Sequence, residues 1–140
     1  MTAQPEHESP LAAALDRVGD RWSFLLVEAL LEGPRRFGEL AAAVPGIASN
    51  VLSQRLKQLE GAGVIVTRPY SKRPLRLEYR LTAPGRELAG VLRLLAHWAA
   101  RHEPTETPRH VVCGTPLEAV WYCPTCHELV QDEGRGLFVI

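Results

Sequence analysis

Leucines at helical spacing predict an amphipathic helix at residues 49–61. Leu52, Leu56 and Leu59 follow one another at intervals of four and three residues, so they share one helix face. Hydrogen-bonding and cationic side chains occupy roughly the opposite face, namely Asn50, Ser53, Gln54 and Lys57. The sequence Gly61-Ala62-Gly63 ends the helix, because glycine accepts the left-handed conformation of a helix cap.

A basic two-stranded hairpin is predicted after this helix. Residues 64–68 are rich in β-branched side chains. Residues 75–81 alternate Leu75, Leu77, Tyr79 and Leu81 inward with Arg76, Glu78 and Arg80 outward, the period of a half-buried strand. The loop between them, residues 69–74, contains two prolines. Helix and basic hairpin together indicate the DNA-contacting half of a winged helix; a merely solvated basic hairpin is the alternative.

Shorter apolar stripes predict three helices before residue 49. They cover residues 11–18, residues 21–31 and a segment that begins at Phe37. Asp20 is a plausible N-cap of the second helix, in which Trp22 is expected to pack in the core. The third helix, the turn Pro45-Gly46 and the helix at 49–61 follow in the order of a helix-turn-helix motif.

A long helix from Ala83 to His102 carries a continuous apolar stripe that needs a cover. The stripe consists of Leu88, Val91, Leu92, Leu95, Trp98 and Ala99. A second copy of the chain, using this helix and residues 11–18, is the economical cover, while packing on its own domain is the alternative. A homodimer would present two reading helices to half-sites about 34 Å apart, or a multiple of that, on a near-palindromic operator.

Positive charge is concentrated in the middle of the chain. The whole sequence has 16 Lys and Arg against 16 Asp and Glu, so its formal net charge is zero. Residues 34–101 contain 12 basic and 4 acidic side chains, a net charge of +8, whereas each flanking segment carries −4. A localised positive field is suited to binding phosphates of double-stranded DNA.

The helix and hairpin supply the candidate DNA contacts. Asn50, Ser53 and Gln54 are candidates for base readout, with Ser49 beside them at the start of the helix. Candidates for phosphate contact or wing insertion are Arg55, Lys57, Lys72, Arg73 and Arg76. Binding rather than catalysis is the expected activity. A winged-helix module that binds an acidic protein is the principal alternative.

All three cysteines lie near the C-terminus in a pattern that predicts a structural zinc site. His110-x2-Cys113 is followed, after nine residues, by Cys123-x2-Cys126. Three thiolates and one imidazole favour zinc over hard cations. His127 competes with His110 as fourth ligand. Three ordinary reduced thiols, or a reversible thiol-based redox sensor through Cys123 and Cys126, remain the alternatives.

The predicted fold class is α+β. It is a winged helix-turn-helix with extra N- and C-terminal dimerisation helices and a small C-terminal zinc-ribbon-like module. The expected parts are a flexible tail at 1–9, the DNA-binding domain at 10–102, a linker at 103–109 and the ribbon at 110–140. No apolar run approaches the ~20 residues of a membrane span, and the first ten residues do not resemble a secretory leader, so we expect a cytoplasmic protein.

From about Pro10 to His102 the chain resembles the HxlR-type family of bacterial winged-helix transcription regulators. The matching residues are Ala14-Leu15-Asp16, Gly19, Trp22, Gly33-Pro34-Arg35-Arg36-Phe37, Glu39-Leu40, Pro45-Gly46-Ile47, Leu52-Ser53-Gln54-Arg55-Leu56, Leu59-Glu60, Gly63, Arg68, Tyr70, Pro74, Glu78-Tyr79, Leu81-Thr82, Gly85 and Trp98. The resemblance implies a homodimeric repressor or activator. Its recognition helix would be Asn50 to Gly61 and its wing Tyr70 to Pro74.

Two positions depart from the family pattern. Members that sense oxidants often carry a cysteine where this chain has Ser9, and a serine hydroxyl is neither a thiolate nucleophile nor a disulfide partner. The family's redox switch is therefore not transferred to this position. Ala48 stands where many relatives have a helix-capping serine, so Ser49 is the alternative cap.

Overall fold

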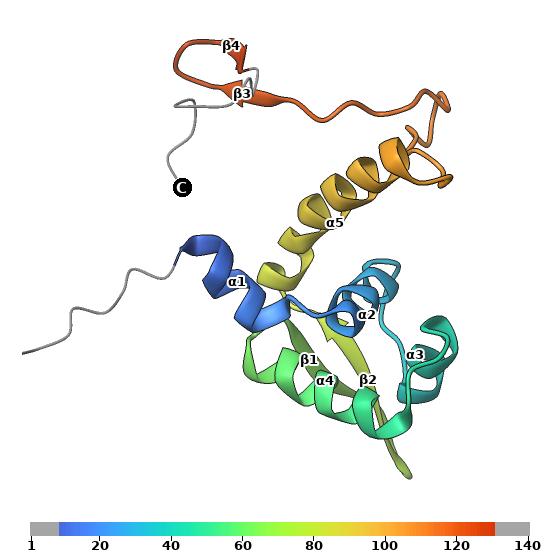
Figure 1. Ribbon diagram of the computed structural model, residues 1–140. Coiled ribbons are helices and arrows are strands. Elements are labelled where there is room, and N and C mark those ends of the chain that lie inside the picture. The colour runs from blue at the N-terminus through green and yellow to red at the C-terminus, as the bar shows by residue number, and fades with distance from the viewer. Residues whose placement is uncertain (1–8, 131–140) are drawn as a thin grey trace, which may run out of the picture. The chain divides into compact units, whose positions relative to one another are not determined.

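The computed structural model describes residues 9–130 (Figure 1). They form two compact units, one up to Leu92 and one from Arg93 onward. The division falls within a helix, whereas the sequence analysis placed the domain boundary after His102. The elements in chain order are α1 (Pro10–Val18), α2 (Arg21–Leu31), α3 (Phe37–Ala43), α4 (Ser49–Gly61), β1 (Ile65–Lys72), β2 (Leu75–Leu81), α5 (Ala83–His102), β3 (Trp121–Cys123) and β4 (Glu128–Val130). The predicted ranges of α2, α4 and α5 are confirmed.

The core of the first unit joins the helices to the base of the β1–β2 hairpin. Leu26 of α2, Leu40 of α3, and Leu52 and Leu59 of α4 are fully buried, and Leu81 of β2 closes the cluster. Trp22 is half-buried and packs against it, as expected. Each buried leucine contributes about 1.5–3 kcal/mol relative to an exposed one, so this cluster fixes the orientation of α4.

Side-chain caps fix the starts of the first two helices. Ser9 Oγ accepts the N–H of Ala12 at 3.0 Å, so this serine belongs to α1 rather than to the predicted tail. The rest of that tail, and residues 131–140 of the proposed ribbon, lie outside the described residues. Asp20 caps α2 as predicted, because its Oδ1 accepts the N–H of Ser23 at 3.1 Å.

The expectation that Ser49 caps α4 is wrong. Ala48 is the N-cap, and no side chain bonds to the first turn there. Ala48 has extended backbone angles, and its carbonyl already accepts the N–H of Leu52 at 2.9 Å. The backbone alone therefore starts the helix, and Ser49 is its first residue with an exposed side chain.

The hairpin is longer than predicted, and its connection is correspondingly shorter. Residues 69–72, expected in a loop, continue β1, and only Arg73-Pro74 separates the strands. The antiparallel pairing runs from Ile65 opposite Leu81 to Lys72 opposite Leu75, with an irregularity between Pro69 and Ser71. Both strands of a two-stranded sheet are edges, and an edge tolerates a proline without a backbone donor. Pro74 therefore lies in the connection as predicted, whereas Pro69 lies within β1 and was a misleading turn signal.

The predicted inward face of β2 is buried only at its base. Leu81 is buried and Tyr79 is half-buried, but Leu75 is 68% exposed and Leu77 is 44% exposed. The hairpin extends beyond the helices to a protruding tip (Figure 1). Alternation of apolar and charged residues correctly predicted the strand, but the described residues place no core beneath its outer half.

The start of α5 is held closely against the base of the hairpin. Thr82 Oγ1 accepts the N–H of Gly85 at 3.1 Å and donates to the carbonyl of Gly63 at 2.6 Å. A Cβ at Gly85 would lie 2.1 Å from the carbonyl oxygen of Val64, so only glycine fits there. Leu88 and Leu92 pack against the core of the first unit. Within the described range, no helix has the length and apolar character needed to cross a membrane.

Candidate nucleic-acid interface

The polar face of α4 is open to solvent. Leu52, Leu56 and Leu59 are buried on one side of the helix, as their spacing predicted. The predicted base-reading and phosphate-binding side chains on the other side are all exposed, namely Ser49, Asn50, Ser53, Gln54 and Lys57. The helix therefore presents amide, hydroxyl and ammonium groups on a rigid support, the chemistry required to read base edges.

Arg55 differs from the other candidates on α4 because it contacts α2. It is half-buried, and its Nε donates to Asp20 Oδ1 at 3.0 Å. Partial burial alone would raise the pKa of Asp20, but the hydrogen bonds from Ser23 and the charge of Arg55 outweigh it. The pKa of this carboxyl therefore lies below its ordinary value of 3.8. The ion pair joins the N-terminus of α2 to the middle of α4 and holds α4 in place.

The tip of the hairpin carries cations without acidic neighbours. Lys72, Arg73 and Arg76 are exposed, as is Arg68 further down β1. Among residues 9–130, no carboxylate lies within ion-pair distance of these four side chains. Arg80, nearer the base, is paired with Glu78 at 2.6 Å. The outer part of the wing thus carries three exposed cations, Lys72, Arg73 and Arg76, that have no carboxylate partner within residues 9–130.

Arg36 connects α3 to the wing. Its guanidinium lies over the ring of Tyr70, 4.3 Å from the ring centroid, and its Nε lies 3.9 Å from Glu39. A cation over an aromatic face is attractive, so this contact stabilises the hairpin from the side. This contact was not predicted from the sequence. Tyr70 of the wing and the Arg35-Arg36 pair were visible as residues that match the family, but not as partners.

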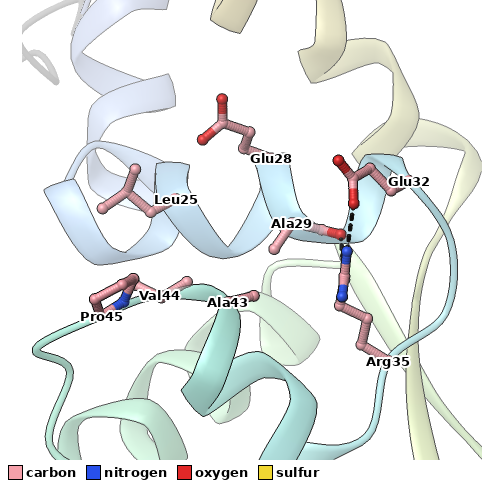
Figure 2. Close-up of a pocket in the computed structure, with 8 residues that line it drawn as sticks. All are labelled: Leu25, Glu28, Ala29, Glu32, Arg35, Ala43, Val44 and Pro45. Atoms are coloured by element: carbon pink, nitrogen blue, oxygen red, sulfur yellow. Dashed lines mark hydrogen bonds and ion pairs between the residues drawn. The ribbon is translucent and has the colours of Figure 1, made fainter.

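Arg35 is half-buried, and its guanidinium is bonded to groups at the C-terminal end of α2. A small cleft of about 230 Å³ lies between α2 and α3, and Arg35 is one of the residues that line it. Its Nε donates to the carbonyl of Ala29 at 2.8 Å, and its Nη2 pairs with Glu32 (Figure 2). Its backbone N–H donates to the carbonyl of Tyr79 at 3.1 Å, and this hydrogen bond joins the segment before α3 to β2. Part of the +8 charge of the central segment is therefore neutralised within the protein.

The four predicted zinc ligands occupy two separate pairs. His110 Nδ1 lies 3.2 Å from Cys113 Sγ, and the N–H of Cys126 donates to Cys123 Sγ at 3.5 Å. A hydrogen bond with Thr115 is the largest of the influences that lower the pKa of Cys113 to about 7. Backbone N–H groups, first that of Cys126, lower the pKa of Cys123. In the part of the chain that the structure describes, no three His, Cys, Asp or Glu side chains converge on one point.

The first unit has the features of a winged helix-turn-helix protein. Helices α3 and α4 form the motif, α2 supports them, and the β1–β2 hairpin protrudes as the wing. The profile of the HxlR-like helix-turn-helix family matches residues 17–107. The chain belongs to this family, as the resemblance predicted.

Individual relatives agree with this assignment. The chain is 39% identical over 120 residues to Mb3122 of Mycobacterium bovis, an uncharacterised HTH-type transcriptional regulator, covering 82% of this chain and 75% of the relative. The crystal structure of PA1607, a proposed transcription factor, superposes on this chain with a TM-score of 0.76 at 31% identity. The match covers 94% of this chain and 95% of the PA1607 chain. The redox regulator HypR in its reduced form gives a TM-score of 0.63 at 30% identity, covering 67% and 93%.

These likenesses confirm the α+β winged-helix fold. The relatives carry the names of transcription regulators rather than of enzymes. The individual DNA-binding, dimer and zinc assignments stay predictions.

Proposed function

We propose that this HxlR-like transcription regulator binds a specific, near-palindromic operator in double-stranded DNA as a homodimer. Helix α4 would enter the major groove, and the wing, about residues 69–75, would contact the backbone or the minor groove. One observation carries the proposal: the exposed hydrogen-bonding face of α4 occurs in the same unit as a protruding hairpin whose cations have no acidic partner within the described chain. No catalysis is proposed.

Base readout is assigned to Asn50, Ser53 and Gln54, with Ser49 beside them. Asn and Gln can each donate to and accept from the N6 and N7 edge of adenine, and a serine hydroxyl can do either with several bases. Ser49, Asn50 and Ser53 are short side chains, and α4 is held by three buried leucines and the Arg55–Asp20 pair. A rigid support lowers the entropy lost when the contacts form.

Phosphate contact is assigned to Lys57, Lys72, Arg73 and Arg76. Within residues 9–130 none of these side chains forms an ion pair, so each phosphate they neutralise would release counterions and make binding weaker at high salt. Arg55 was also predicted to contact phosphate, but its Nε already donates to Asp20. We infer that Arg55 acts mainly by positioning α4, and that Lys57 and the wing supply most of the salt dependence.

The dimer is assigned to α1 and α5. Apolar side chains on both helices are exposed in the single chain, namely Leu11, Leu15, Val91, Leu94, Leu95 and Trp98. Covering them with the same helices of a second copy would remove this apolar surface from water and create a two-fold axis. Two copies of α4 would then read two half-sites.

Because the proposed ligand is chromosomal DNA, we propose that the regulator acts in the cytoplasm.

The test begins by mapping bound sites across the genome with the full chain and deriving an operator. Binding to operator and to scrambled DNA is then measured over a series of salt concentrations. Gln54→Ala should lower the preference for operator by about 1–3 kcal/mol per changed base contact while keeping the salt slope. Lys72→Ala with Arg73→Ala should weaken binding to both DNAs and reduce the slope by about 1 per lost phosphate contact.

The matched control removes two exposed cations far along the chain from α4 and the wing, Arg93→Ala with Arg101→Ala. Light scattering must show that the control keeps the oligomeric state of the parent. Equal affinity of parent and both interface variants for operator and scrambled DNA would contradict the assigned contacts. A protein captured by the wing without competition from DNA would instead support the alternative, an interaction module for an acidic partner.

A redox sensor is the second candidate, favoured by the likeness to HypR, a redox regulator. Its thiols would be Cys123 and Cys126, since Ser9 occupies the position of the family's sensing cysteine. Treatment with an oxidant should then release the operator from the parent but not from Cys123→Ser. Release that persists in Cys123→Ser would exclude this candidate.

A further inference from the structure

Two turns in the second unit share one backbone geometry. In the first, the N–H of Gly114 donates to the carbonyl of His110 at 2.8 Å, and Gly114 has a φ of +70°. In the second, the N–H of His127 donates to the carbonyl of Cys123 at 2.9 Å, and His127 has a φ of 58°. Each turn thus has metal-binding residue types at its first and fourth positions and a left-handed residue at its fifth.

Each turn is the end of its own hairpin. Around the first turn, the N–H of His110 donates to the carbonyl of Thr115 and the N–H of Leu117 donates to the carbonyl of Pro108, both at 2.8 Å. The second turn connects β3 to β4, with Cys123 paired with Glu128. The 3.2 Å between His110 Nδ1 and Cys113 Sγ is close to the ~3.6 Å separation of a nitrogen and a sulfur on tetrahedral zinc. Both hairpins therefore present two ligands from one end.

In the described residues that carry these hairpins, no buried apolar side chain holds them together. None of the described residues from 103 to 130 is buried, and Val111 and Val112 are 98% and 86% exposed. Apolar burial therefore contributes little to this part of the chain. Small modules that cannot bury enough surface are usually stabilised by a metal or by disulfides.

We propose that His110, Cys113, Cys123 and Cys126 bind one structural Zn²⁺ per chain. The two pairs lie on hairpins joined by residues 118–120, which form no helix or strand. Among the described residues the two pairs do not converge on one point, so binding a single ion requires them to come together, and metal binding would be coupled to folding of the module. The three thiols each release a proton as Zn²⁺ binds, the imidazole binds in its neutral form, and no electron is transferred.

The matched turns also decide between the two candidate histidines. His127 occupies the left-handed fifth position, the equivalent of Gly114, and not a ligand position. Its Nδ1 lies 2.9 Å from the hydroxyl of Tyr122, with which it shares a hydrogen bond. His110 holds the first position of its turn and already lies next to Cys113. The fourth ligand is therefore His110.

The test measures metal on the full chain, purified without chelator and, separately, refilled with Co²⁺. One zinc per chain is expected by elemental analysis, and the cobalt form should show the bands of a tetrahedral site with thiolate ligands. His110→Ala, Cys113→Ser and Cys126→Ser should each lose most of the metal after dialysis. His127→Asn is the matched control, because asparagine tolerates the left-handed conformation, and it should retain one zinc.

Several results would overturn the proposal. Metal-free protein whose three thiols react equally fast with and without added Zn²⁺ would exclude the site. Half a zinc per chain would mean a site shared between two copies, and loss of metal in His127→Asn but not in His110→Ala would exclude His110. Far-UV circular dichroism would confirm that each variant is folded. None of these measurements depends on DNA binding.

Discussion

The two units of the chain differ in what holds them together. The described residues up to Leu92 contain all twelve buried hydrophobic side chains, whereas the described residues from Arg93 to Val130 contain none. The first unit also has ion pairs and caps that connect separate helices, such as Asp20 with Arg55. The second has two hydrogen-bonded hairpins that carry thiols. Apolar burial therefore positions the recognition helix, whereas the described part of the C-terminal module contains no buried apolar side chain that could stabilise it in the same way.

The largest expected effect is on the core beneath α4. Leu52→Ala removes a fully buried side chain and should lower the free energy of unfolding by about 2–5 kcal/mol, measured by urea denaturation. Leu75→Ala is the control, because Leu75 is 68% exposed on the wing, and its effect should stay within about 0.5 kcal/mol. Similar losses in the two variants would contradict the position of the core.

Removal of metal should destabilise the second unit and leave the first unit unchanged. A chelator should increase hydrogen exchange and proteolysis at residues 103–130, because the proposed zinc holds the two hairpins together. Exchange at α2 and α4 should not change, since their stability comes from burial. Increased exchange throughout the chain would mean that the first unit also depends on metal, and would remove the distinction.

Asp20→Ala tests whether polar contacts add to burial in the first unit. It removes the cap of α2 and the partner of Arg55, so the free energy of unfolding should fall by about 1–2 kcal/mol. Asp20→Asn should restore part of this loss, because asparagine is also a good N-cap. If Asp20→Asn were as unstable as Asp20→Ala, the charge pair rather than the cap would account for the effect.

The same carboxylate predicts a dependence of stability on pH. The pKa of Asp20 is lower in the folded protein than its ordinary value of 3.8, so its contribution is fully present above that value. The contribution is lost as the pH falls below 3.8 and through the lowered pKa of the folded state. As the pH falls through this range, the free energy of unfolding measured in urea should therefore decrease more steeply for the parent than for Asp20→Ala. Parallel curves would contradict the shift.

The smallest expected effect is at the contact between α3 and the wing. Arg36→Ala removes the cation over Tyr70 and should weaken binding to operator by about 0.5–1 kcal/mol through loss of wing order, beyond its lost charge. Arg36→Lys keeps the charge but not the planar stacking, and should recover only part of the affinity. Full recovery in Arg36→Lys would show that charge alone matters.

Much of the first unit followed from local patterns. Apolar residues three and four apart predicted the bounds of α2, α4 and α5, and an aspartate before an apolar run predicted the cap at Asp20. The same periodicity predicted which side chains of α4 are exposed. These features depend on neighbours within one or two helical turns, so a sequence can determine them alone.

Other features depended on contacts between distant parts of the chain. Arg55 and Asp20 are 35 residues apart, and only the packing of α4 on α2 brings them together. The exposure of Leu75 and Leu77 follows from a hairpin that extends past the core, and the strand through Pro69 follows from its place at a sheet edge. The sequence by itself determined which helices of the first unit form and which face of α4 is polar. Tertiary structure decided which charges are paired and which remain free, because a side chain's partners depend on elements that meet only after the chain has folded.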